Sequence, residues 1–276
     1  MKKVGIVLAL CLAFAQLSAK EIININRDWR FFGSSEGSSD RARNVNLPHT
    51  WNNDALSGRD DYFRGAGNYM KDIHVPLEWR NKRVFIRFAG AGTVTDLIVN
   101  GRHVGEHRGG FTAFVFELTG YLKHGETNQL WAVVNNAPRL DVLPTAGDNN
   151  VYGGIYRDVE LIVAEPSHIA LSHYASDGIY VHQKSVTREK AELETTVRID
   201  GLAGRTLNID MAVLTAEGDT AAVQSTKFKV PEKGTGSVSL PATLLRPRLW
   251  NGTLDPYMYR VAVRLTDDGL PCDEAN

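Results

Sequence analysis

Short runs of alternating apolar and polar residues recur from about Ile22 to the end of the chain, and no run keeps a helical period. A period of two places successive side chains on opposite faces, which is the pattern of a half-buried β-strand. In Leu130–Asn135, Trp131 and Val133 share one face, and Ala and Val residues share the other. Turn-forming residues separate the runs. The sequence therefore predicts an all-β chain.

Several strands can be placed in the first half of the chain. Ile22–Arg30 is a first candidate, and Val84–Phe88 is a second, whose even-numbered residues share a face. Thr93–Val99 is expected to be its neighbour. The pair Asn100-Gly101 suits a type I′ hairpin turn, after which Arg102–His107 would return antiparallel.

The second half shows plainer strands after a break at Glu165-Pro166, where a proline cannot continue a central ladder. The predicted strands are Ala191–Asp200, Leu207–Leu214, Ala221–Val230, Gly236–Leu240 and Tyr257–Thr266. About seven short strands in roughly 110 residues are typical of an immunoglobulin-like sandwich. We therefore expect one β-sandwich over residues 20–165 and an immunoglobulin-like β-sandwich over residues 166–276.

Residues 1–19 have the pattern of an export signal. Lys2-Lys3 precedes the apolar run Val4–Leu17, and small residues stand ahead of Lys20. A membrane anchor is the alternative, but the run is shorter than the roughly 20 residues of a membrane span. We expect a secreted or periplasmic protein that begins near Lys20 and has no membrane segment after signal removal. Cys272 would be its only cysteine, which leaves no intramolecular disulfide.

The charge balance argues against two classes of partner. The formal net charge is −1, and removal of Lys2 and Lys3 with the signal makes it more negative by two. Neither state favours nucleic acid or an anionic membrane. Apolar residues make up 43 % and charged residues 23 %, as in globular proteins with a packed core.

The most informative stretch joins a polar loop to an expected strand through Gly153-Gly154. The loop holds Asp148, Asn149 and Asn150, and the strand pattern begins at Ile155. Two glycines permit a positive φ or a close approach of the backbone to another group. The short polar side chains either close a turn or hydrogen-bond a ligand rich in hydroxyls, and the stretch alone leaves both open.

Several separated motifs occur together in a fixed order. They are Leu47–Asn52, Asn68–Lys71, Val99–Gly105, Gly109–Phe114 and Tyr152–Val159, with Leu249-Trp250 and Asp255–Tyr259 farther on. In this order they resemble the N-terminal sugar-binding domain and the following immunoglobulin-like domain of glycoside hydrolase family 2, which includes β-galactosidases, β-glucuronidases and β-mannosidases. The resemblance covers nearly all of the expected mature chain. It implies a galactose-binding-like jelly roll as the first sandwich.

The resemblance also implies a division of labour. In the family, two catalytic glutamates lie in a (β/α)8 barrel that follows these two domains, and an acidic residue six positions before the second glycine reaches the sugar subsite. In this sequence that position is Asp148. Asn149 in the same loop has a short polar side chain that could hydrogen-bond the same ligand. Asp61, which stands beside Tyr62 in another loop, either reaches the sugar as well or belongs to a plain turn. The expected partners are a β-galactoside or related glycoside and the catalytic barrel of a parent chain.

The end of the chain bears on two hypotheses. A barrel needs about 250 residues, which do not fit before Asn276. On the first hypothesis the chain is the non-catalytic front of a β-galactosidase-like hydrolase, and on the second it is a complete carbohydrate-binding module. Asp267-Asp268-Gly269 opens a hairpin whose return strand, from Leu270, is cut short, which would leave an exposed edge. This favours truncation.

No catalytic residue is expected in the chain itself. Retaining glycoside hydrolysis needs two carboxyls about 5 to 5.5 Å apart. The adjacent pairs Asp60-Asp61, Asp267-Asp268 and Asp273-Glu274 would point to opposite faces of a strand, so they are interpreted as surface or turn residues.

Histidines and tryptophans complete the candidates. His103 and His107 would share a strand face, but no third ligand accompanies them, so neither a metal nor another cofactor is predicted. His49 is expected to be a packed residue bonded to backbone rather than a base. The tryptophans could stack on sugar rings, although most should lie in the core. They are Trp29, Trp51, Trp79, Trp131 and Trp250.

Overall fold

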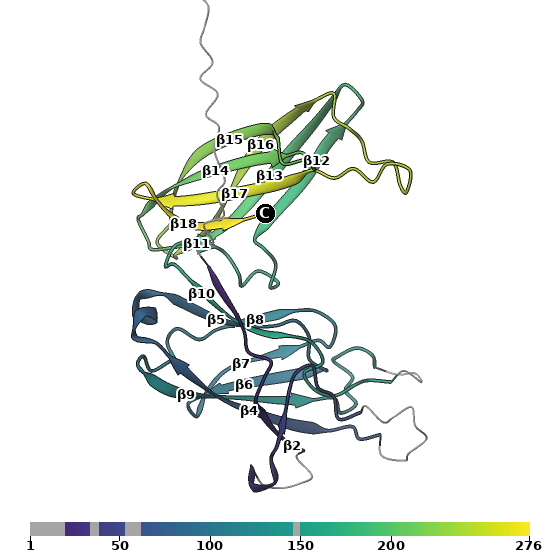
Figure 1. Ribbon diagram of the computed structural model, residues 1–276, viewed down its shortest axis with the longest axis vertical. Coiled ribbons are helices and arrows are strands. Elements are labelled where there is room, and N and C mark those ends of the chain that lie inside the picture. Colours follow the sequence, from purple (N-terminus) through teal and green to yellow (C-terminus); the bar gives the residue numbers. More distant parts are fainter. Residues whose placement is uncertain (1–19, 34–38, 53–61, 146–149) are drawn as a thin grey trace, which may run out of the picture.

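The computed structural model describes residues 20–33, 39–52, 62–145 and 150–276. Two β-sandwiches follow one another along the long axis of the molecule, and β10 (Val159–Ala164) leads from the first toward the second (Figure 1). Every pairing between the described strands is antiparallel. The all-β prediction is confirmed.

The first sandwich has a four-stranded and a six-stranded sheet. The smaller sheet has the order β1-β10-β5-β8, with β1 at Glu21–Asn24, β5 at Arg83–Phe88 and β8 at Phe114–Glu117. The larger has the order β3-β2-β4-β9-β6-β7, with strands at Arg43–Val45, Trp29–Gly33, Ala66–Val75, Glu126–Asn135, Val94–Val99 and Arg102–Arg108. Short 3-10 turns lie at Ser39–Arg41 and Leu77–Asn81. No helix in the part of the chain that the structure describes is long and apolar enough to cross a membrane.

The core of this sandwich follows the alternation in the sequence. Val84, Ile86 and Phe88 of β5 are fully buried between the two sheets, as their shared face predicts. On the opposite face of β5, Phe85 is buried in a cluster that also contains Ile162, Ala164 and Leu171. Arg83 and Arg87 beside it stay partly exposed, so on this face only the centre of β5 is buried.

Three strand predictions need correction. The expected strand Ile22–Arg30 is two strands, β1 and β2, which belong to different sheets, and Asp28 between them has φ 59°. The strand expected at Thr93–Val99 does not lie beside β5, because β6 belongs to the other sheet. The strand expected from Ile155 begins only at Val159. A period of two shows that a strand forms but not which strand lies beside it.

The hairpin between β6 and β7 agrees with its turn signal. Asn100 and Gly101 have φ 51° and 77°, the positive values that a type I′ turn requires at both central positions. Along β7, a bulge lets Leu97 face Gly105 while its neighbour Ile98 faces His103. The irregularity shifts the phase of the side chains within the strand.

The second sandwich also has two sheets. In one, β13 (Lys190–Asp200) lies between β16 (Thr235–Leu245) on one side and β12 (Ile179–Val186) with the short β11 (His168–Ile169) on the other. The other has the order β15-β14-β17-β18, with strands at Thr220–Lys229, Thr206–Leu214, Arg260–Asp267 and Leu270–Ala275. Its core includes Val197, Met211 and Leu265. The five strands predicted here all form, whereas β11 and β12 were not predicted.

The return strand after Asp267-Asp268-Gly269 forms. β18 pairs with β17 from Asp267 back to Val263, so the exposed edge expected at this hairpin is absent along those residues. Asp273 within β18 is fully buried, which contradicts the prediction of a surface residue. Its carboxylate accepts a hydrogen bond of 2.6 Å from Ile169 N and pairs with Lys20 Nζ at 2.8 Å. The first described residue is thus tied to the last strand.

Candidate functional site

The candidate site lies at the end of the first sandwich, where the chain enters and leaves the segments 53–61 and 146–149. We use the name loop-base cluster for Asn52, Tyr62, Asn136, Val151 and Gly153. Asn52 and Tyr62 flank the first segment, and Val151 and Gly153 follow the second. Asn136 comes directly after β9, so the six-stranded sheet fixes its position.

Asn52 is the centre of the loop-base cluster and is only 2 % exposed. Its Oδ1 accepts hydrogen bonds from Gly153 N at 2.7 Å and from Asn136 Nδ2 at 3.1 Å. Its Nδ2 donates to Phe63 O at 2.8 Å. A buried amide is tolerated when its polar atoms have partners of this kind. Asn52 therefore joins three chain segments through one side chain.

Asn136 is fully buried and is satisfied in the same way. Its Nδ2 also donates to Val151 O at 2.7 Å, and its Oδ1 accepts from Gly65 N at 2.8 Å. The backbone N–H of Asn136 donates to Gly65 O at 3.0 Å. These bonds fix both the start of β4 and the segment that leads to Gly153.

Tyr62 closes the cluster. Its hydroxyl donates to Val151 O at 3.0 Å, and Val151 N donates back to the same hydroxyl. Tyr62 follows Asp61 directly, and Val151 comes two residues after Asn149. The residues that flank two of the predicted ligand-binding segments are therefore in contact with each other.

Gly153 and Gly154 make the close approach that the sequence predicts. A Cβ on Gly153 would stand 2.0 Å from the ring of Trp51, and one on Gly154 would stand 2.5 Å from His49 O. Gly154 also has φ 119°, which side chains rarely adopt. The turn from the loop into the sheet is thus compatible only with glycine at both positions.

A cluster of four aromatic side chains packs against this turn. Phe31, His49 and Tyr69 pack with ring centroids 4.7 to 5.6 Å apart, and Trp51 stacks on Phe31 at 5.8 Å. His49 Nδ1 and Tyr69 Oη are joined by a hydrogen bond of 2.7 Å. His49 is packed as expected, although its ring bonds a hydroxyl and not the backbone. Burial, with a smaller effect of Arg43, lowers the pKa of His49 to about 4, so the ring is neutral at pH 7.

A shallow pocket opens beside the loop-base cluster. It has a volume of about 140 Å³, and its lining includes Asn150, Phe111, Tyr152, Tyr156 and Arg157. Phe111 is 65 % exposed and Tyr152 is 40 % exposed. Exposed aromatic rings next to an amide and a guanidinium can contact the apolar and the polar edges of a ring with many hydroxyls. Because the volume is below the roughly 300 Å³ of ordinary ligand pockets, it would contact one side of a ligand only.

The predicted substrate-binding residues Asp148, Asn149 and Asp61 lie outside the described residues, and their roles stay predictions. The same holds for Asp60. Sequence reasoning missed Asn52 and Asn136 as structural residues of the site. Asn52 stands in a turn after Trp51 and Asn136 directly follows β9, and neither setting reveals that the side chain is buried.

The remaining candidates are surface or structural residues. Asp267 and Asp268 both pair with Arg205. His103 and His107 do not share a face, because the bulge in β7 lies between them. His103 bonds Asp96 at 2.9 Å, and His107 stacks on Phe114 with ring centroids 4.0 Å apart. Among the described residues, no group of three His, Cys, Asp or Glu could hold a metal ion.

The tryptophans are divided between core and surface. Trp29 and Trp79 are buried, Trp51 and Trp131 are half-buried, and Trp250 is 64 % exposed. The expectation that most of them lie in the core therefore holds fully for two. The exposed one belongs to the second sandwich, far along the chain from the loop-base cluster.

The fold and the loop-base cluster define a class: two β-sandwiches in series, the first with a candidate ligand-binding end, and no parallel barrel in the described ranges. A model described as "Glycosyl hydrolases family 2, sugar binding domain" matches residues 35–166, and a second, "Glycosyl hydrolases family 2", matches residues 174–276. The chain belongs to glycosyl hydrolase family 2.

The chain is also similar to individual glycosidases, in agreement with this family assignment. The chain is 40 % identical over 256 residues to a β-glucuronidase of Bacteroides fragilis, covering 92 % of this chain and 36 % of the relative. It is 30 % identical over 259 residues to a β-galactosidase of Thermoanaerobacter pseudethanolicus, covering 89 % and 33 %. The crystal structure of a Bacteroides uniformis β-glucuronidase superposes with a TM-score of 0.86 at 31 % identity, covering 93 % and 32 %. The chain thus spans about a third of the length of these relatives.

Proposed function

We propose that this chain is the N-terminal, non-catalytic portion of a secreted family 2 glycosidase that hydrolyses β-galactosides or related glycosides, β-glucuronides included. Its part is to supply sugar contacts and a scaffold beside the catalytic barrel of the parent chain. The names of the relatives support this substrate range. The export pattern of residues 1–19 supports a secreted or periplasmic location.

The observation that carries the proposal is the contact between Tyr62 and Val151. It brings together the flanks of the two segments that contain Asp61 on one side and Asp148 with Asn149 on the other. A carboxylate at Asp148 can accept hydrogen bonds from two sugar hydroxyls. Charge-assisted bonds of this kind contribute about 1.5 to 3 kcal/mol each when they are shielded from water. In the chain without a barrel this shielding is weaker, so free sugar should bind weakly.

The first experiment assays the purified chain with chromogenic β-galactosides and β-glucuronides. We expect no turnover above background. Turnover that survives removal of host enzymes and disappears when one acidic residue of this chain is mutated would show that the chain is catalytic by itself.

The second experiment uses the full-length enzyme and compares the variant Asp148→Ala with the control variant Asp72→Ala. Asp72 is an exposed aspartate on β4. Loss of one charge-assisted bond should lower kcat/KM of the Asp148 variant by roughly ten-fold or more, with an unchanged Tm. The Asp72 variant should keep wild-type kinetics. Wild-type kinetics in the Asp148 variant, or activity lost only through early melting, would make Asp148 a turn residue.

A stand-alone carbohydrate-binding module is the second candidate. It is favoured by the exposed rings of Phe111 and Tyr152 beside Asn150 and Arg157, a set of side chains that could contact a sugar without a barrel. A module of this kind should bind free galactose or glucuronic acid tightly enough for calorimetry at micromolar concentrations. Binding only in the millimolar range or weaker supports the hydrolase portion instead.

A further inference from the structure

One loop of the first sandwich exposes leucines beside the candidate site. The loop leaves the loop-base cluster at Asn136 and returns to it at Val151, and the bond of 2.7 Å from Asn136 Nδ2 to Val151 O joins its two ends. We use the name leucine arm for residues 139–143 of this loop. By sequence, the same loop contains the predicted sugar contact Asp148, which lies outside the described residues.

The leucine arm exposes two apolar side chains to water. Leu140 is 92 % exposed and Leu143 is 70 % exposed, whereas Val142 between them is buried. Single exposed leucines are common on protein surfaces. Two of them on one short segment with a buried neighbour form an exposed apolar surface, and such a surface usually marks a contact site.

A network of ion pairs holds the leucine arm against the end of β7. Asp141 accepts hydrogen bonds from Arg139 Nε at 2.8 Å and Arg139 Nη2 at 2.9 Å, and it also pairs with Arg108. Arg108 in turn pairs with Glu106 at 2.5 Å. The hydrogen bonds from Arg139 lower the pKa of Asp141 to about 2, so this carboxylate is charged at neutral pH. The ion pairs and the buried Val142 therefore fix the arm from two sides.

The same network joins the leucine arm to the shallow pocket of the candidate site. Phe111, which lines that pocket and is 65 % exposed, follows Arg108 by three residues. Both charged side chains of the arm, Arg139 and Asp141, are paired. A charged ligand group would lose water at the arm without gaining an opposite charge. The arm therefore suits a neutral, apolar part of a ligand whose sugar lies at the pocket.

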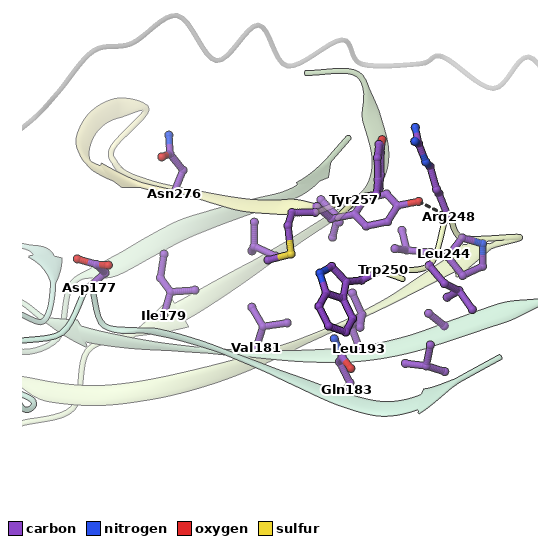
Figure 2. Close-up of a pocket in the computed structure, with 18 residues that line it drawn as sticks. Asp177, Ile179, Val181, Gln183, Leu193, Leu244, Arg248, Trp250, Tyr257 and Asn276 are labelled. Atoms are coloured by element: carbon purple, nitrogen blue, oxygen red, sulfur yellow. Dashed lines mark hydrogen bonds between the residues drawn. The ribbon is translucent and has the colours of Figure 1, made fainter. Parts of the chain in front are cut away.

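The exposed leucines also differ from the apolar surface of the second sandwich. There, a groove of about 790 Å³ is lined by Val181 and Trp250 among others, and none of its lining residues belongs to the first sandwich (Figure 2). Two leucines present far less surface than the roughly 800 Å² that each partner buries in a stable protein interface. A small ligand group therefore fits the leucine arm better than a protein surface does.

We propose that the leucine arm contacts the aglycone of the substrate and favours β-glycosides whose aglycone is neutral and apolar, aromatic aglycones in particular. The sugar lies at the shallow pocket, and the group on the other side of the glycosidic bond lies on Leu140 and Leu143. This inference rests on the proposed function, because it takes a β-glycoside as the ligand.

The test uses the full-length enzyme and two substrates with the same sugar, 2-naphthyl β-D-glucuronide and methyl β-D-glucuronide. The corresponding pair of β-D-galactosides is measured in parallel. The double variant Leu140→Ser/Leu143→Ser should lower kcat/KM for the naphthyl glycoside by about five-fold or more, the effect of leaving roughly 40 Å² of apolar surface uncovered. For the methyl glycoside, kcat/KM should change by less than about two-fold, because a methyl group covers little of the two leucines.

Two control variants check that the effect depends on apolar contact at this place. Leu140→Met/Leu143→Met keeps the apolar surface and should keep the wild-type ratio of the two kcat/KM values. Leu254→Ser changes a leucine of the second sandwich that is 87 % exposed, and it should leave both values unchanged. An equal loss for both substrates in the serine double variant would mean that the leucines pack on the barrel or position the sugar, and it would overturn the proposal. Unchanged kinetics with the naphthyl glycoside would overturn it as well.

Saturation-transfer NMR with the purified chain separates this inference from the proposed function, because it needs no turnover. With 2-naphthyl β-D-glucuronide in excess, the naphthyl protons should receive saturation from the wild-type chain and lose most of it in the serine double variant. If the full-length enzyme hydrolyses none of these glycosides, the proposed function fails, and the NMR result alone decides the inference. Naphthyl protons that receive no saturation, or equal saturation from both chains, would then overturn it.

Discussion

The loop-base cluster predicts a large effect for Asn52→Ala. The substitution removes one amide and leaves the N–H of Gly153 without its partner. The carbonyl of Phe63 loses one of two donors and keeps Trp51 Nε1 at 3.3 Å. Asn136 keeps its bond to Val151 and loses only its second acceptor. The site is 2 % exposed in the native protein, so bulk water does not replace these bonds.

The magnitude follows from the groups left unpaired. Each buried polar group without a partner costs about 1 to 3 kcal/mol. The N–H of Gly153 is one such group, and the lost bonds to Phe63 and Asn136 add about 0.5 to 1.5 kcal/mol each, which gives about 2 to 6 kcal/mol. A water molecule in the space of the amide would recover part of this. We expect a loss of about 2 to 4 kcal/mol. For a chain of this size, that corresponds to a Tm lower by about 4 to 16 °C.

Calorimetric melting of the purified chain would measure this effect. Asn44→Ala is the control, because Asn44 lies exposed on the edge strand β3 of the same sandwich. The control should stay within about 1 °C of the wild type. If Asn52→Ala has the same Tm as the control variant, the hydrogen bonds of Asn52 do not stabilise the loop-base cluster.

Two further predictions concern a glycine and a histidine. Gly153→Ala should unfold at a clearly lower urea concentration than Gly120→Ala. A Cβ on Gly153 would stand 2.0 Å from the ring of Trp51, whereas one on Gly120 would meet no atom within 4 Å. Equal unfolding midpoints for the two variants would contradict the close packing at Gly153. Burial lowers the pKa of His168 to about 4, against about 6.5 in an unfolded chain. Between these two pH values the unfolded state binds more protons than the folded state. The free energy of unfolding therefore falls as the pH drops from 6.5 to 4, by up to about 3 kcal/mol. His168→Gln should flatten this slope in denaturant titrations at several pH values. An unchanged slope would assign it to other groups, such as His49, whose pKa burial also lowers to about 4.

Local patterns in the sequence determined many of the strands and turns. β9 alternates between buried and half-buried residues from Asn128 to Asn135, as the period of two along a strand predicts. Asn100-Gly101 makes the turn that its residue types favour. Gly153 makes the close approach that a residue without a side chain permits. Each of these features depends on a few neighbouring residues, so a short stretch of sequence is enough to predict it.

The candidate site was only partly predictable. Its place at the loop before Gly153-Gly154 follows from the sequence and the family resemblance. The hydrogen bonds that organise it do not, because Gly153 N and Asn52 Oδ1 are 101 residues apart in the chain. An asparagine has the same appearance in a sequence whether it is solvated or buried with all its partners.

The tertiary structure also decided the phase and the surroundings of individual strands. A bulge opposite Leu97 separates the faces of His103 and His107, although their spacing alone puts them together. Asp273 is buried because Ile169 N, 104 residues away, and Lys20 supply its partners. Alternation along a strand is set by neighbouring residues, whereas strand order and the burial of a polar group depend on which distant segments the folded chain brings into contact.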